Sequence, residues 1–435
     1  MQPLPPKEIS FWMETVAAPT AITSLPLPET ADVAVIGAGF TGLSAARALA
    51  KRSLKVVVLE AESLGWGASS RNGGMVLTGL KLGIGDLLAK YGRETALKMY
   101  TASMAAINCV EQIIQEDRIG CDFFRSGHLE LACKPAHLKG FFQSAEVLAR
   151  ELNHKVRVIP RNELHHEIGS SFDHGGLLDE ASAGLNPARY VAGLVRAAES
   201  AGASLYDQTR VEKIEREAKG SGKMFRLSTS RGILRAREVF VATSGYTGDA
   251  TPTLRKKIVP IGSYIIVTEP LSEDVARDVS PGNRMMFDSK NFLYYFRLTP
   301  DRRMLFGGRA AFFPETAKTV QKSAEILRQG MIRVFPQLRD ARVAYAWGGT
   351  LDFAFDLLPH AGQLDGLYFA LGYAGHGVAM ATYLGMKMAN SICGEREENP
   401  FAELPFPDAP LGIYRRTPWF LPFVGAWYKF LDWVN

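Results

Sequence analysis

Cysteine is scarce in this sequence, and its positions argue against two kinds of site. Only four cysteines occur in 435 residues, at Cys109, Cys121, Cys133 and Cys393. They lie far apart, without a C-x-x-C motif or a histidine at metal-ligand spacing, so neither a disulfide framework nor a zinc site is indicated. We therefore expect no bound metal and a reducing, cytoplasmic location.

A long apolar run is missing near the N-terminus. Residues 1–30 are rich in proline and lack a basic start followed by an apolar stretch, so we expect a surface arm and neither a signal peptide nor a membrane-spanning helix. Residues 417–435 are rich in Trp and Phe and are interrupted by Pro418 and Pro422. Two interpretations of this tail remain open: it packs on the body of the protein, or it makes a peripheral contact with a membrane surface.

No strong excess of charge of one sign is present. The 50 basic and 45 acidic residues give a net charge of +5, and the densest basic run is only Arg255–Lys257. This pattern predicts a solvated surface and no nucleic-acid partner. The 47% hydrophobic and 22% charged residues are typical of a globular protein, and the length predicts more than one domain.

The chain shows no repeat and no low-complexity linker, which favours domains that share it discontinuously. A strand at 32–36, a glycine turn at 37–42, a helix to about 52 and a strand at 55–60 predict a βαβ unit. Alternating aromatic and polar residues at 258–268, 292–298, 303–308 and 342–347 predict an antiparallel sheet. The expected fold is therefore α/β, with a Rossmann-like domain (31–83, 184–254 and 348–395) interleaved with an α+β substrate domain (84–183 and 255–347), between an arm (1–30) and a tail (396–435).

The glycine turn has the full context of a dinucleotide site. Gly37 permits the tight turn, Gly39 lets a pyrophosphate approach the backbone, and Gly42 lets the helix pack closely on the strand. The N-terminus of the helix offers free N–H groups and a positive dipole end to phosphates. Glu60 ends the second strand, where it is expected to accept hydrogen bonds from the hydroxyls of an adenosine ribose.

A small-residue loop, Leu64 to Gly74, follows the acidic strand and lets a long cofactor continue past its pyrophosphate. With its G-A-S-x-R-N-G-G run, the sequence resembles the D-amino acid oxidase/glycine oxidase superfamily of FAD proteins, and within it the γ-glutamylputrescine oxidoreductase-like branch. The resemblance spans nearly the whole chain and is also carried by Phe11-Trp12, Leu185 to Tyr190, Val239 to Gly245, and Gly372 to Gly377.

The motif and the resemblance together predict noncovalent FAD. The final glycine turn and the helix after it should point N–H groups at the pyrimidine end of the flavin, where negative charge develops on reduction. By the same resemblance, Val211 meets the adenine through its backbone. The expected contacts are Gly37, Gly39, Phe40, Thr41, Gly42, Glu60, Ala61, Gly67, Ala68, Ser69, Arg71, Asn72, Gly73, Gly74, Val211, Thr243, Gly245, Gly372, Gly375, His376, Gly377 and Val378.

The reacting site needs a substrate C–H held over flavin N5 and an unprotonated nitrogen, without a nucleophile or a metal. Each candidate has a structural alternative: a helix-capping or loop histidine, an ordinary aromatic residue of the sheet core, or a surface ion pair. The candidates are His376 and His360 near the flavin, Tyr264, Tyr295 and Trp347 in an aromatic cage for an alkylamine, and Arg309 as a carboxylate anchor.

Two differences from sarcosine oxidases narrow the range of substrates that we expect. Those relatives carry a lysine just after the glycine–histidine–glycine turn, which holds the substrate carboxylate, and a cysteine that binds flavin covalently. Here the turn continues Gly377-Val378-Ala379, and residues 347–350 contain no cysteine. An amine or ω-amino compound, with noncovalent FAD, is the better expectation.

Three functions remain open at this point. The first is an amine or amino acid oxidase, in which the amine becomes an imine and reduced FAD is reoxidised by oxygen. The second is a dehydrogenase that passes electrons to a quinone or carrier at the membrane. The third is a catalytically silent FAD-binding assembly or regulatory protein on the same fold.

Overall fold

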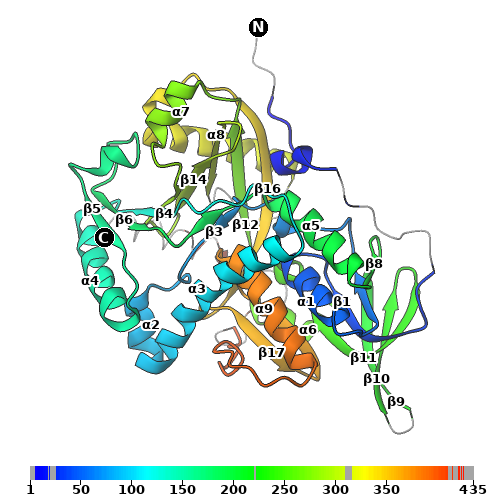
Figure 1. The fold of residues 1–435 in the computed structure, drawn as a ribbon. Helices are drawn as coiled ribbons and strands as arrows, with labels where there is room; N and C mark the ends of the chain where they lie inside the picture. Colours follow the sequence, from blue (N-terminus) through cyan, green and yellow to red (C-terminus); the bar gives the residue numbers. More distant parts are fainter. Residues whose placement is uncertain are drawn as a thin grey trace.

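The computed structural model of the protein describes residues 5–17, 19, 26–219, 222–308, 316–409, 414, 420, 421, 423 and 425. Two large sheets dominate it, and Figure 1 shows them as separate layers with long helices between and around them. The predicted α/β architecture, a Rossmann-like unit combined with an antiparallel sheet, is confirmed.

The first sheet has a parallel centre that is built around the predicted βαβ unit. Its glycine turn joins β1 to α1 (Phe40–Ala50). β9 (Val211–Lys219) and β10 (Gly222–Thr229) extend the sheet as an antiparallel hairpin that projects from the domain (Figure 1). The order of the other strands is β17 (His360–Leu364), β18 (Leu367–Leu371), β11 (Gly232–Val241), β1 (Thr30–Ile36), β2 (Val56–Leu59) and β8 (Ser204–Tyr206).

Both faces of this parallel centre are buried, because successive side chains of a strand point to opposite sides. Val33 and Val35 of β1 face a cluster formed with helices, whereas Ala34 and Ile36 face the apolar side of β10 and β11. The helices on the first face are α1, α3 (Arg93–Glu116), α5 (Pro187–Ser200) and α9 (Gly377–Ile392). α3 and α9 contact each other, and Figure 1 shows them crossing near the middle of the molecule.

The second sheet is antiparallel except for one parallel pair, β13 with β4. α7 (Glu273–Val279) and α8 (Ala317–Val334) cover its outer face, and α2 (Ile84–Tyr91) and α4 (Pro135–Leu152) lie at the β5 end. The strand order is β16 (Val343–Ala354), β12 (Ile258–Thr268), β15 (Met304–Gly308), β14 (Tyr294–Leu298), β13 (Met285–Asp288), β4 (His128–Leu131), β6 (Gly175–Asp179) and β5 (Arg157–Pro160).

The inner face of the second sheet packs on the nucleotide domain. The predicted arm contributes here: Phe11 and Trp12 pack with Ala188 of α5 and with Trp347 of β16. β16 itself continues to Ala354, beyond the domain boundary expected at 347/348. Short elements complete the fold: β3 (Met75–Val76), β7 (Ala183–Gly184) and α6 (Pro252–Arg255).

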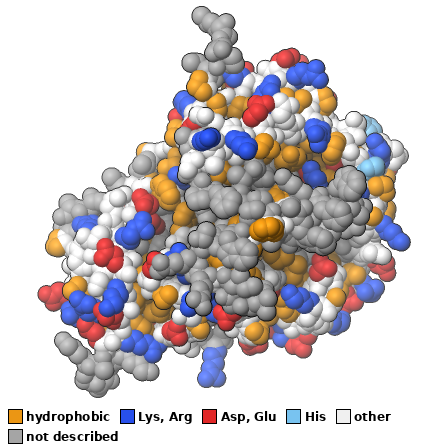
Figure 2. Space-filling view, turned by 180° about the vertical axis from the view of Figure 1, so that it is seen from behind, with side chains coloured by type: hydrophobic (Ala, Val, Ile, Leu, Met, Phe, Trp, Pro, Cys, Tyr) orange, Lys and Arg blue, Asp and Glu red, His pale blue; other side chains and the backbone are white. Residues whose placement is uncertain are grey.

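The described surface mixes charges of both signs. On the face in Figure 2, blue basic and red acidic side chains are interspersed. Exposed ion pairs of the structure include Lys98–Glu94, Lys213–Glu215 and Arg277–Glu273. Among the described residues, no helix has the length and apolar character needed to cross a bilayer. Most of the aromatic tail, 417–435, lies outside the described residues.

Candidate active site

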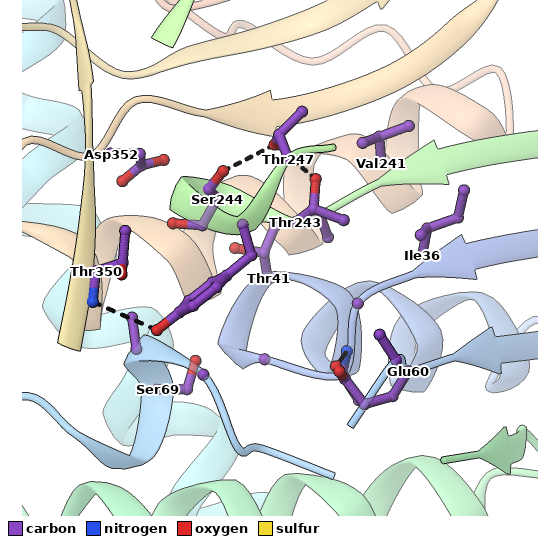
Figure 3. Close-up of a pocket in the computed structure, with 18 of the residues that line it drawn as sticks. Ile36, Thr41, Glu60, Ser69, Val241, Thr243, Ser244, Thr247, Thr350 and Asp352 are labelled. Carbon is purple, nitrogen blue, oxygen red and sulfur yellow. Dashed lines mark hydrogen bonds between the residues drawn. The ribbon is translucent and has the colours of Figure 1, made fainter. Parts of the chain in front are cut away.

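A cavity of about 630 Å³ lies in the nucleotide domain, and both glycine turns line it. Residues 37–41 enter from the β1–α1 turn, and Gly375, Gly377 and Val378 enter from the β18–α9 turn. Figure 3 shows this cavity between the end of β11, the start of α1 and the strand that carries Thr350 and Asp352. The two turns that were expected to hold opposite ends of one molecule therefore open into the same space.

The first turn can be built only with glycine. Gly37 has a φ of +104°, and a Cβ there would lie 2.7 Å from the carbonyl oxygen of Ala242. A Cβ on Gly42 would lie 1.9 Å from the carbonyl oxygen of Gly37, so any side chain would push α1 off β1. Gly42 acts through this close packing and does not line the cavity.

Glu60 closes the first turn from the end of β2. Its carboxylate accepts hydrogen bonds from the backbone N–H groups of Ala38 at 2.8 Å and Glu62 at 3.0 Å, and Ala61 beside it also lines the cavity. Burial raises the pKa of Glu60, while these N–H donors act in the opposite direction. A carboxylate retains further acceptor positions for the hydroxyls of a ribose.

The small-residue loop folds over the start of α1. The Ser69 hydroxyl accepts a hydrogen bond from the Phe40 N–H at 3.0 Å, and Asn72 binds its own loop through Ala68, Ser69 and Gly74. Gly67, Ala68, Ser69 and Asn72 line the cavity, whereas Arg71, Gly73 and Gly74 do not.

Arg71 holds the outer edge of this loop. Its guanidinium donates to the carbonyls of Trp66 and Gly348 and lies 4.7 Å from the Trp66 ring. Gly73 faces the ring of Tyr295, which a Cβ would approach to 3.2 Å.

The end of β11 supplies the polar wall drawn in Figure 3. Thr243 and Thr247 share a hydrogen bond of 2.7 Å between their hydroxyls, and Tyr246 accepts from the Thr350 N–H at 3.3 Å. Gly245 lies against Thr350 and does not line the cavity. Val211, expected at the adenine, lines the cavity at the start of β9.

Asp352 anchors the second turn, and sequence reasoning missed it. Its carboxylate accepts hydrogen bonds from the N–H groups of Gly372 at 2.6 Å and Tyr373 at 3.3 Å, and its carbonyl accepts from Ala374 at 2.9 Å. Burial raises the pKa of Asp352. A lone carboxylate between Leu351 and Phe353 of a strand was the available signal, because a buried charge needs donors.

His376 stands at the N-cap of α9 without a side-chain hydrogen bond to the helix. Burial, and then the Lys81 ammonium, lower the pKa of His376 to about 3, so the imidazole is neutral at pH 7. Its Nδ1 has no partner among the described residues. The first N–H groups of α9 next to it thus remain available at the cavity.

The other described residues that were predicted to contact the substrate do not lie together: they lie on different faces of the second sheet or outside it. Tyr295 and Trp347 point to the inner face, and the Trp347 indole donates to the Arg71 carbonyl at 2.9 Å. Tyr264 packs in the outer core under α8 and does not reach the inner face. His360 is bound to Asp356 at 3.0 Å and stacks on Phe406, away from the cavity, and Arg309 lies outside the described residues.

Comparison with known proteins places this architecture in a family. The model of the DAO family, described as FAD dependent oxidoreductase, matches residues 32–391. The chain is 33% identical to the probable oxidoreductase OrdL of Haemophilus influenzae (85% of this chain, 84% of that protein) and 32% identical to γ-glutamylputrescine oxidoreductase of Escherichia coli (93% of each). The crystal structure of glycine oxidase from Geobacillus kaustophilus is similar with a TM-score of 0.71 at 21% identity, covering 88% of this chain and 99% of that one. The chain therefore belongs to the DAO family of FAD-dependent oxidoreductases.

Proposed function

We propose that this protein binds FAD noncovalently and oxidises the carbon next to an amine nitrogen, so that the amine becomes an imine. The observation that carries the proposal is the cavity lined by both glycine turns. The names of two relatives, γ-glutamylputrescine oxidoreductase and glycine oxidase, point to the same class of substrate.

The residues of the cavity fit FAD at both of its ends. Glu60 has acceptor positions for the ribose, and Gly39 begins α1 with no side chain of its own over the first N–H groups. A Cβ on Gly375 would meet nothing within 4 Å, so this turn leaves open space beside the start of α9. Bound there, FAD supplies a flavin that accepts a hydride from the substrate.

Noncovalent binding is supported by the positions of the cysteines. None of the four residues, Cys109, Cys121, Cys133 and Cys393, lines the cavity. Burial raises the pKa of each of these thiols, which disfavours the nucleophilic thiolate.

The protein side chains orient the substrate. Tyr295 and Phe287 neighbour each other on the inner sheet face and offer an aromatic wall to an alkyl chain. His376 is neutral at pH 7, so it does not repel an approaching ammonium, and its unpartnered Nδ1 can accept a hydrogen bond; with a pKa of about 3 it does not take up the amine's proton. An amine that has lost this proton presents the nitrogen lone pair that the oxidation requires.

Anaerobic mixing with candidate amines tests the proposal. The yellow flavin absorbance should be bleached by at least one of γ-glutamylputrescine, 1,4-diaminobutane, glycine or sarcosine. A matched control is Gly39→Val, whose side chain would collide with the Ser69 hydroxyl and block FAD. Purification without flavin would contradict the proposal, and bound flavin that no amine or amino acid reduces would contradict it and favour a silent FAD-binding protein.

The electron acceptor is part of the same proposal. We propose oxygen, and peroxide formed in air should match the amine consumed. Reduction of a quinone or dye without peroxide would instead identify the dehydrogenase, for which contact of the C-terminal tail with a membrane would provide a site of electron delivery.

A further inference from the structure

One row of side chains crosses the inner face of the second sheet. The pairing register places Glu130 of β4 opposite Phe287 of β13, Phe287 opposite Tyr295 of β14, and Tyr295 opposite Gly307 of β15. Residues that are paired in register point to the same face of a sheet. Glu130 is therefore on the same side as Tyr295, two strands and about 10 Å away.

The Tyr295 end of this row lies against the FAD-domain loop, since the Tyr295 ring faces Gly73. The opposite end lies under α4, because Leu177, the partner of Glu130 on β6, packs against Phe141 of that helix. Glu130 is half-buried between these two covered parts of the face. The Lys81 ammonium acts electrostatically on both Glu130 and His376, which connects this position to the start of α9.

The Glu130 carboxylate has no hydrogen bond or ion pair with any described residue; its backbone pairs with β13 and β6. Its strand neighbours Leu129 and Leu131 point to the outer apolar core, so Glu130 shares the inner face of β4 only with His128, which is bound to Ser182 and stacks on Phe287. Burial raises the pKa of Glu130 to about 7, although Lys81 acts to lower it. A half-buried carboxylate without a partner costs stability, which a cationic ligand would offset.

We propose that Glu130 binds a second, cationic group of the substrate, on the side of Tyr295 away from the flavin loop. This inference rests on the proposed amine oxidation and adds its substrate class: amines whose second ammonium lies several bonds from the reacting carbon. Tyr295 and Phe287 flank the connecting alkyl chain, and Glu130 ends the row. Glu130 is a specificity residue that contacts the end of the substrate remote from the oxidised carbon.

The test compares 1,4-diaminobutane with 1-aminobutane, which lacks the second nitrogen, in the FAD-loaded enzyme. Glu130→Gln should lower kcat/KM for the diamine about ten- to hundredfold, the loss of one charge-assisted hydrogen bond, and leave kcat/KM for the monoamine unchanged. The matched control is Glu199→Gln, because Glu199 is also half-buried with a raised pKa but lies on α5. Equal losses for both amines, or no loss for either, would overturn the assignment.

A second variant keeps the test decisive if Glu130→Gln fails to fold. Glu130→Asp retains the charge but withdraws it by one methylene, so the preferred substrate should shift from 1,4-diaminobutane to 1,5-diaminopentane. An unchanged length preference would refute the role of Glu130. If no amine reduces the flavin of the unmodified enzyme, the proposed function itself is wrong, and this outcome is distinct from a failure of the Glu130 subsite.

The pH profile gives an independent readout. In the unmodified enzyme, kcat/KM for the diamine should rise with an apparent pKa near 7 as Glu130 ionises, and this limb should disappear in Glu130→Gln. The titratable or charged groups that act on Glu130 are Lys81, Asp288 and Tyr100; His128 lies on the same face of β4, and Lys81 also acts on His376. Burial raises the pKa of Tyr100, so its ionisation does not fall near 7. His128 and His376 have lowered pKa values, so their protonation does not produce this limb.

Discussion

The Thr41 hydroxyl and the Tyr373 hydroxyl share a buried hydrogen bond of 2.8 Å across 332 positions of sequence. Thr41 belongs to the first turn of α1, and Tyr373 to the turn before α9. α1 and α9 approach so closely that a Cβ on Gly385 would lie 2.3 Å from the Thr41 carbonyl oxygen. The two halves of the proposed FAD site are thus tied to each other as well as to the cofactor.

Removing this bond should weaken FAD binding. Tyr373→Phe or Thr41→Val is expected to raise the Kd for FAD roughly fivefold, about 1 kcal/mol, because the two turns are no longer held in register. Fluorescence titration of the apoprotein with FAD measures this, and the double variant should cost no more than either single one. Tyr190→Phe is the control, since it removes another buried Tyr–Thr bond that does not line the cavity. If Tyr190→Phe raised the Kd for FAD by the same factor, the loss would not be specific to the Thr41–Tyr373 bond.

Asp352→Asn should destabilise the second turn. An asparagine amide presents N–H groups where the carboxylate accepts from Gly372 and Tyr373, so at least one buried donor loses its acceptor. The expected loss is about 1–3 kcal/mol of unfolding free energy, measured by urea denaturation of the apoprotein. Asp173→Asn should be neutral, because the buried Asp173 Oδ1 has no partner among the described residues. A stable Asp352→Asn would contradict the anchoring role.

The Asp179–His154 pair should give the region of the second sheet around β6 an acid-sensitive contact. Burial alone would raise the pKa of Asp179, but the His154 hydrogen bond at 2.8 Å and further donors lower it to about 2. The stabilisation is therefore present above the unfolded value of 3.8 and is lost as pH falls through about 2. It amounts to about 2 kcal/mol.

The same bond raises the pKa of His154, so the contribution of His154 is present below 6.5 and is lost as pH rises through its folded value. The free energy of unfolding should therefore change less with pH in Asp179→Asn than in the unmodified protein, both as pH falls towards 2 and as it rises above 6.5. If the unfolding free energy of the variant still falls at low pH as steeply as that of the unmodified protein, Asp179 is not responsible for the fall.

His376→Asn should slow flavin reduction by roughly ten- to a hundredfold, because the ring no longer positions the amine, without moving the apparent pKa of the rate. The pKa of His376 is lowered to about 3, so this side chain does not titrate in the range where the enzyme is assayed. Stopped-flow reduction at several pH values measures both quantities. His360→Asn is the matched control, because His360 is bound to Asp356 outside the cavity, and its rate should be unchanged. A pKa shift in His376→Asn would contradict a neutral imidazole.

The local part of the site was predictable from the sequence. The βαβ unit, Glu60 and the second glycine turn depend on contacts within a few residues or on backbone geometry that only glycine allows. Asp352 and the Thr41–Tyr373 bond were missed because they join segments that meet only through tertiary packing.

The predicted aromatic cage was only partly predictable for the same reason, because it depends on tertiary packing. Alternation predicts that Tyr264 and Ile265 point to opposite faces, but only the packing of α8 decides which face is the outer one. Tyr264 therefore lies in the outer core and Tyr295 on the inner face, although both stand in similar aromatic strands. His360 lies away from the cavity and stacks on Phe406, which belongs to a segment distant in the sequence.

β16 carries Trp347 at the inner wall and Asp352 at the second turn, and it is paired with β12 along its length. The two positions are separated by about 17 Å of continuous strand. Because β16 is held by this ladder to β12, the wall that we propose meets the substrate and the turn that we propose meets the flavin keep one fixed spacing. Substrate range can then change through the neighbouring strands while the hydride-transfer distance stays the same.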